Sequence, residues 1–266
     1  MPDEVIRSKD NKTIKEIKKL HEKRHRNINN KFIVEGLRFV KEALESDFEV
    51  QYVIVNENVR ERFIDLKIDK NINEIIVSES VFKNLCSTEG PQGILAVVNN
   101  KEVNANVQNG FYVLADKVQD PGNMGTIIRT ANAAGANGVI LTKGTVDIYN
   151  EKTLRATMGS IFKIPVIIDE DLRFLNKLKE NSFKLVTSSL DTDKNFYDID
   201  LNTKVIIAVG NEGNGVSDEI YRLSDEKVKI PMPGNAESLN VGIAAGIMMF
   251  EVVRQKKSWN IYIKCI

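Results

Sequence analysis

The sequence contains few of the residues and patterns that mark several common classes of protein. Of its 266 residues only Cys86 and Cys265 are cysteine, and their separation argues against a disulfide framework, which fits a reducing cytosol. The charged N-terminus lacks the apolar segment of a secretion signal, which argues against export. The longest apolar stretch, 239–250, is too short to span a bilayer. We therefore expect a cytoplasmic protein that does not insert into a membrane.

Histidine is equally scarce. The chain has two, His21 and His25, so residues 32–266 contain no imidazole that could serve as a general base or complete a Ser-His-Asp triad. Their spacing of four residues suits metal ligands on a helix, but no cysteine or carboxylate pattern accompanies it, so we expect no metal site. Both are better interpreted as part of a basic surface that faces a polyanion such as RNA.

The composition that remains is that of an ordinary globular protein, with 42% apolar and 28% charged residues and enough length for two domains. The net charge is zero, yet residues 1–31 hold ten Lys and Arg residues against five Asp and Glu residues. This basic segment indicates a polyanionic partner. It is equally consistent with the solvated face of a helix, because Ile14, Ile17 and Leu20 are spaced along one helical side.

The order of patterns predicts an α/β protein with two domains. Residues 1–100 alternate between strand and helix patterns, as in a small α/β domain, and the polar stretch 101–110, "KEVNANVQNG", predicts a linker. Residues 111–266 repeat an apolar run, a turn rich in Gly, Asn and Pro, and a helix, which indicates a parallel sheet covered by helices. Ligands of such sheets bind beyond the carboxyl ends of the strands, so the turns there are the candidate site.

Three of these turns carry unusual residues. "VGNEGNGVSDEI", 209–220, resembles a phosphate-binding turn, but Glu212 would repel a phosphate and no Gly-Lys-Ser/Thr follows, which excludes a P-loop enzyme. In "DPGNMGTIIRTANAAG", Arg129 can reach a phosphate, or can be a surface arginine whose stem packs on its helix. In "IPMPGNAESLNVGIAAGIMMFEVVRQ", Ser238 is expected to cap a helix that is apolar nearly all round, which suggests burial against a second copy of the chain.

Taken together and in this order, the three segments resemble the three motifs of the SpoU-type RNA ribose 2′-O-methyltransferases of the SPOUT superfamily. The likeness runs from 111 to 255, and "FIVEGLRFVKEAL" with "TEGPQGILAVV" resembles the ribosomal-protein-like substrate-binding domain often fused to them. The resemblance implies a trefoil-knotted α/β methyltransferase domain that forms a homodimer, binds S-adenosylmethionine and methylates one ribose 2′-hydroxyl in structured RNA. Bare backbone in the glycine turn would then bind the cofactor.

The resemblance also implies roles for individual residues. The positions that line the cofactor or lie near it are Gly210, Ile230, Leu239, Thr187, Asn211 and Met232. The polar positions around the reaction centre are Asn123, Arg129, Glu212, Ser238 and Asn240. We expect Arg129 to bind a substrate phosphate and polarise the hydroxyl, because a guanidinium is a poor base. That Arg129 accepts the proton is the second possibility.

Two function classes stay open on the sequence. The complete polar set favours an enzyme over a catalytically idle RNA-binding protein of the same fold. The substrate-binding domain favours large-subunit ribosomal RNA over transfer RNA, and basic residues 1–31 would grip RNA through its phosphates. The sequence does not name the nucleotide, nor does it separate a housekeeping modification from an antibiotic-resistance methylation.

Overall fold

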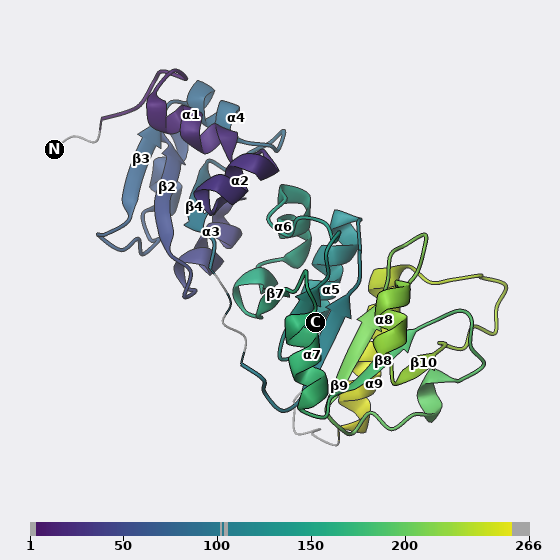
Figure 1. Cartoon of the computed structure of the whole chain (residues 1–266). Helices are drawn as coiled ribbons and strands as arrows, with labels where there is room; N and C mark the ends of the chain where they lie inside the picture. The colour runs from purple at the N-terminus through teal and green to yellow at the C-terminus, as the bar shows by residue number, and fades with distance from the viewer. Residues whose placement is uncertain (1–3, 102, 104–105, 257–266) are drawn as a thin grey trace. The chain divides into compact units, whose positions relative to one another are not determined.

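The computed structural model describes residues 4–101, 103 and 106–256, and it divides into two compact units (Figure 1). The first unit comprises Met1–Glu102 and Tyr149–Phe162, and the second comprises Val103–Ile148 and Lys163–Ile266. The division falls at the start of the expected linker, of which residues 102, 104 and 105 lie outside the described residues, as does Cys265. Packing adds Tyr149–Phe162 to the first unit, which a division by sequence order did not include.

The first unit contains a four-stranded sheet. Its strands follow the order β1 (Lys31–Glu35), β4 (Ile94–Asn99), β2 (Val50–Asn56) and β3 (Asn73–Val77), with β2 and β3 parallel and the other pairs antiparallel. Helices α1 (Lys12–Lys19) and α4 (Glu79–Leu85) share one hydrophobic cluster with alternate residues of the strands. Helix α3 (Leu37–Leu44) also packs on β1, β2 and β4, and η1 (Glu57–Phe63) follows β2.

The basic N-terminal segment forms two short helices, α1 and α2 (Lys23–Asn29). Asn11 caps α1 by accepting hydrogen bonds from the backbone N–H groups of Thr13 and Ile14. Ile14, Ile17 and Leu20 are buried in the cluster, as their spacing predicts, so the lysines between them are left on the outer side.

The second unit contains a six-stranded sheet in which every pair is parallel, as predicted. Its order is β10 (Glu226–Val228), β8 (Lys184–Ser188), β9 (Val205–Val209), β5 (Phe111–Ala115), β6 (Val139–Leu141) and β7 (Val166–Ile168). All five residues of β5 and of β9 are buried, so both faces of the sheet centre are covered.

Helices cover the two faces of this sheet in pairs. Helices α7 (Arg173–Glu180) and α8 (Asp218–Leu223) contribute to one hydrophobic cluster with Tyr112, Leu114 and alternate residues of the neighbouring strands. Helix α9 (Val241–Gln255) packs on β9 and against α5 (Pro121–Ala133). In the described part of the chain no helix is long and apolar enough to cross a membrane.

A buried carboxylate organises the edge of the sheet where the functional turns are expected. Asp116 directly follows β5 and is 1% exposed. It accepts a hydrogen bond of 2.7 Å from the Thr142 hydroxyl and one of 2.6 Å from the backbone N–H of Ser217. Because both bonds satisfy carboxyl oxygens that are buried away from water, Asp116 fixes the end of the glycine turn beyond β9.

Candidate active site

A cavity of about 420 Å³ lies beyond the carboxyl ends of β8, β9 and β10. The strands are parallel, so the turns that follow them gather at one edge of the sheet, and the start of α9 completes the wall. The lining comprises residues 188–190, 209–213, 215, 221, 228, 230, 232, 238–241 and 244. Two of the three turns singled out by sequence therefore form most of this wall.

The predicted cofactor residues fall on this wall with one exception. Gly210, Asn211, Ile230, Met232 and Leu239 line the cavity. Thr187 is fully buried behind it and shares a 2.6 Å hydrogen bond with the Ser224 hydroxyl.

The sequence interpretation missed Ser188, Ser189 and Tyr221 as lining residues. The pair of serines at the end of an apolar run was the available signal, because residues at that point of a parallel strand face the ligand edge.

The glycine turn holds its shape through its own backbone. A Cβ atom on Gly210 would lie 2.1 Å from the carbonyl carbon of Gly215 and 2.2 Å from the backbone nitrogen of Val216, so only glycine fits. Asn211 and Gly215 exchange backbone hydrogen bonds of 2.8 and 2.9 Å. The Asn211 side chain accepts from the N–H groups of Gly213 and Asn214, each at 3.0 Å. The part of the cavity wall formed by this turn is therefore preformed.

Glu212 links this turn to the start of α5. Its carboxylate accepts hydrogen bonds from the backbone N–H groups of Gln119 and Asp120, at 3.2 and 3.1 Å, and from the Asn123 side chain at 3.0 Å. Burial opposes ionisation, but these hydrogen bonds outweigh it and lower the pKa of Glu212 below its usual value. Glu212 is therefore a fixed carboxylate at neutral pH.

Asn240 continues the same chain of hydrogen bonds and also begins α9. Its Nδ2 donates to Asn123 Oδ1 at 2.8 Å, and its Oδ1 accepts from the N–H groups of Gly242 and Ile243 at 2.9 and 3.3 Å. The expectation that Ser238 caps this helix is wrong. Asn240 stands directly before the first helical residue and satisfies its free N–H groups, whereas Ser238 lies two residues earlier, exposed in the cavity wall.

Arg129 lies on α5, and its side chain is exposed. Within the described part of the chain it has no hydrogen-bond or ion-pair partner, and it is not among the residues that line the cavity. Among the predicted polar residues the structure thus joins Asn123, Glu212 and Asn240 in one hydrogen-bonded set. It leaves the guanidinium of Arg129 available to a group from outside the unit.

Comparison with known families decides the assignment of this unit. The model of the SpoU rRNA Methylase family matches residues 110–250, and the model of the MRM3-like substrate binding domain matches residues 11–96. The chain belongs to the SpoU rRNA methylase family. The resemblance found in the three turns is thereby confirmed, together with the two-part α/β fold class, whereas the knot stays a prediction.

Several SpoU relatives resemble this chain over nearly its whole length. It is 37% identical to the 23S rRNA (guanosine(2553)-2′-O)-methyltransferase RlmP of Bacillus subtilis, over 93% of this chain and 98% of that one. An AdoMet-bound rRNA methyltransferase from Sinorhizobium meliloti has a TM-score of 0.85 at 33% identity, covering 94% and 97% of the two chains. AviRb from Streptomyces viridochromogenes, in complex with AdoMet, has a TM-score of 0.83 at 27% identity, with coverage of 93% and 99%.

Proposed function

We propose that the chain is an S-adenosylmethionine-dependent methyltransferase that modifies a ribose 2′-hydroxyl in large-subunit ribosomal RNA. The observation that carries the proposal is the cavity beyond β9, because five of the six residues assigned to the cofactor by family motif line it and two of them, Gly210 and Asn211, lie in the hydrogen-bonded glycine turn. The 37% identity to the Bacillus subtilis 23S rRNA 2′-O-methyltransferase supports the same reaction and the same class of RNA.

The cavity suits the cofactor in size and chemistry. Its volume of about 420 Å³ lies within the range of small-molecule sites, which are typically about 300–1,000 Å³. Ile230, Met232 and Leu239 offer apolar contact for an adenine ring, while Gly210, Gly213 and Gly215 contribute backbone atoms to the wall. When bound, S-adenosylmethionine supplies the electrophilic methyl group.

The polar residues near the cavity then act on the RNA. Arg129 has a free guanidinium that can hold a phosphate beside the target ribose and polarise the 2′-hydroxyl. Glu212 keeps Asn123 in place through its hydrogen bond, and Asn123 in turn orients the side chain of Asn240. Transfer of the hydroxyl proton to Arg129 is the alternative, and it requires the guanidinium to lose a proton first.

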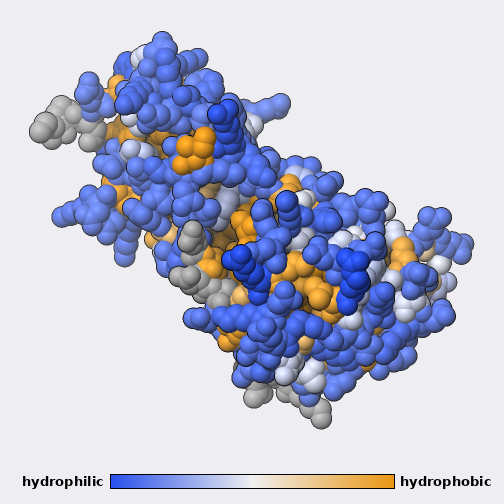
Figure 2. All heavy atoms as spheres, in the orientation of Figure 1, coloured by the Kyte–Doolittle hydropathy of each residue, from blue (hydrophilic) through white to orange (hydrophobic). Residues whose placement is uncertain are grey.

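We further propose that the chain acts as a cytoplasmic homodimer, without a resident metal. On α9, Ile243 is 54% exposed and Phe250 is 49% exposed, and their spacing of seven places them on one side of the helix. A second copy of the chain would cover Ile243 and Phe250 and bring another set of α5 and α9 residues close to the site. Elsewhere on the chain, Figure 2 shows apolar residues at the surface among hydrophilic ones.

Transfer RNA is the second candidate substrate. A relative from Staphylococcus saprophyticus, 30% identical over 84% of this chain and 96% of its own, is called a putative TrmH family tRNA/rRNA methyltransferase. The alternative of an idle RNA-binding protein is disfavoured by the intact set of Asn123, Glu212 and Asn240.

The test is methylation in vitro. The protein and labelled S-adenosylmethionine are incubated with unmodified ribosomal and transfer RNA, and the methylated ribose is mapped. We expect label in large-subunit ribosomal RNA at one position. Label confined to transfer RNA would overturn the substrate, and cofactor binding without any transfer would favour the idle protein.

A further inference from the structure

A second cavity, of about 880 Å³, lies within the first unit and takes no part in the site described above. Its wall joins three parts of the sequence: the α1–α2 segment, the end of α4 with the residues after it, and the start of α6 (Glu151–Thr157). We call this cavity the basic cleft. Its cationic side chains are Lys15, Lys18, Lys19, Lys83, Lys152 and Arg155, against two carboxylates, Glu22 and Glu151.

The cations face the cleft because of how α1 packs. Ile14, Ile17 and Leu20 are buried against the sheet of the first unit, which turns Lys15, Lys18 and Lys19 to the opposite side of the helix. Within the described residues Lys19 has no hydrogen-bond or ion-pair partner. Lys15 and Lys83 are paired only with exposed carboxylates of Asp10 and Glu79, and such surface pairs are weak enough to exchange for a ligand.

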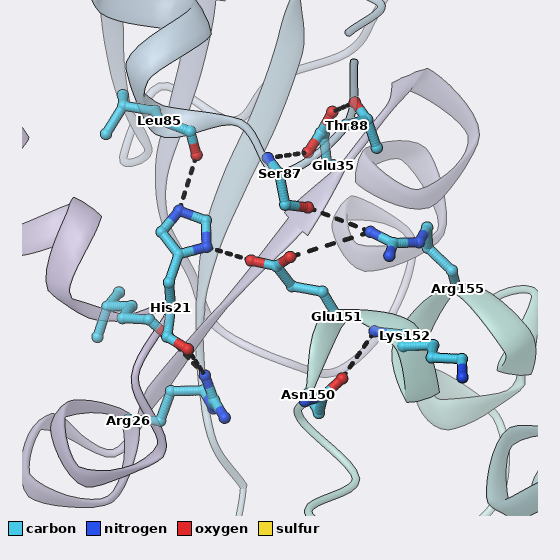
Figure 3. A network of polar contacts seen from close by, with 11 residues as sticks. His21, Arg26, Glu35, Leu85, Ser87, Thr88, Asn150, Glu151, Lys152 and Arg155 are labelled. Carbon is cyan, nitrogen blue, oxygen red and sulfur yellow. Dashed lines mark hydrogen bonds and ion pairs between the residues drawn. The ribbon is translucent and has the colours of Figure 1, made fainter. Parts of the chain in front are cut away.

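The two carboxylates do not cancel this charge. Figure 3 shows Glu151 held between His21 and Arg155. His21 also bonds the carbonyl oxygen of Leu85 through Nε2, at 2.9 Å, so both of its ring nitrogens face acceptors and both are satisfied by the protonated form. The hydrogen bond with Glu151 raises the pKa of His21 despite burial. Glu22 is an exposed side chain at the rim.

Arg155 is itself fixed in position. Its guanidinium donates to the Ser87 hydroxyl at 3.2 Å, and the backbone N–H of Ser87 donates to Glu35 (Figure 3). The side chains at the base of the cleft are therefore held in place by hydrogen bonds, and lysines line its edge. None of its lining residues is Phe, Tyr or Trp, so it has no platform on which a nucleobase could stack.

We propose that the basic cleft binds the phosphodiester backbone of the RNA substrate, with Lys19 of α1 and Lys152 of α6 as direct phosphate contacts. The proposal rests on the proposed function for the nature of the RNA. Cations without a stacking platform contact phosphates rather than bases, so the cleft contributes affinity and placement without reading sequence. Residues 149–162 connect β6 to β7 in the chain, so an RNA strand held here touches the stretch that leads into the second sheet.

The test is a double substitution, Lys19→Gln with Lys152→Gln, compared with a matched control of equal charge, Lys41→Gln with Lys70→Gln. The control lysines are exposed, lie in the same unit and do not line the cleft. Binding of unmodified large-subunit ribosomal RNA transcripts is measured across a series of salt concentrations. We expect the cleft variant to lose roughly tenfold in affinity. The slope of log affinity against log salt, which is negative, should become less steep by about one to two. The control should change neither.

Cofactor calorimetry and methyl transfer separate this inference from the proposed function. We expect the cleft variant to bind S-adenosylmethionine like the unmodified protein and to raise the KM for RNA with kcat preserved. An unchanged salt slope, or an equal loss in the control, would overturn the phosphate site even if methylation proceeds. If the unmodified protein methylates no RNA while the cleft variant still lowers RNA affinity, the proposed function fails and the phosphate site stands.

Discussion

At Gly210 the backbone passes so close to Gly215 that the turn has no room for a Cβ atom. Because a Cβ there would overlap the backbone of Gly215, Gly210→Val must push the turn out of shape. We expect calorimetry to detect no binding of S-adenosylmethionine by this variant. Gly234→Ala is the control, since a Cβ at Gly234 has no neighbour within 4 Å, and it should bind normally. Normal binding by Gly210→Val would place the cofactor elsewhere.

Substitution of Arg129 should affect methyl transfer rather than cofactor binding, because Arg129 does not line the cavity. We expect Arg129→Ala to lower kcat by about a hundredfold or more while the affinity for S-adenosylmethionine stays unchanged, as for a group that acts on the RNA in the transition state. Arg173→Ala, which removes an arginine with an 88% exposed side chain, is the control and should leave turnover intact. Full activity in the Arg129 variant would remove it from the mechanism.

Individual residues also show where sequence reasoning stops. The turn that holds Gly210 and Glu212 could be predicted as part of a ligand site, because it follows a buried strand of a parallel sheet and is rich in glycine. The cap on α9 could not, because Ser238 and Asn240 are both good capping residues and only the point at which the helix begins decides between them. The hydrogen bonds that join Glu212, Asn123 and Asn240 connect turns far apart in sequence, which no local pattern reports.

Among the elements, the stretch Tyr149–Phe162 packs in the first unit although the residues on both sides of it in the sequence belong to the second unit. The pattern of strands and helices predicted for 111–266 assigns it to the second domain, whereas in the structure it packs in the first unit. Phe162 lies in an aromatic cluster with Phe32, Phe39 and Phe48, at centroid distances of 6.3, 5.5 and 5.1 Å. These rings come from the first unit's sheet, helix α3 and a loop, so the contact depends on tertiary structure that periodicity does not encode.

The same stretch gives the protein a pH-dependent contact, the ion pair of His21 with Glu151. The pKa of His21 is raised above its ordinary 6.5, so its contribution to stability is complete below that value and is lost as pH rises through the higher pKa of the folded state. Burial opposes ionisation of Glu151 and is the largest single effect, but the hydrogen bonds from His21 and Ser87 together with the charges of His21 and Arg155 outweigh it. They lower the pKa of Glu151, which keeps the pair charged in mildly acidic solution.

We therefore expect Glu151→Gln to lower the free energy of unfolding by about 1 kcal/mol near pH 6 and by less near pH 9. Chemical denaturation of both proteins at the two pH values measures this difference. Glu45→Gln, which breaks an exposed ion pair with Lys41 on α3, is the control and should show no such pH dependence. A cost that is the same at both pH values would mean that His21 does not change its charge between them, which would contradict the expected titration.

For the whole molecule, the open question is whether one chain is the working unit. Helix α9 buries Ala245, Met248 and Met249, yet its Ile243 and Phe250 are exposed to solvent in a single chain.

We expect sedimentation to give twice the 30.0 kDa mass of the chain at micromolar concentration. Replacing Ile243 and Phe250 together by Glu should yield a monomer that keeps its fold, because neither side chain is part of the core. Ile64→Glu, at an 82% exposed position of the first unit, should remain dimeric. The monomeric variant should also lose methyl transfer, because the start of α9 lines the cavity. An unmodified protein that is monomeric and fully active would refute the dimer.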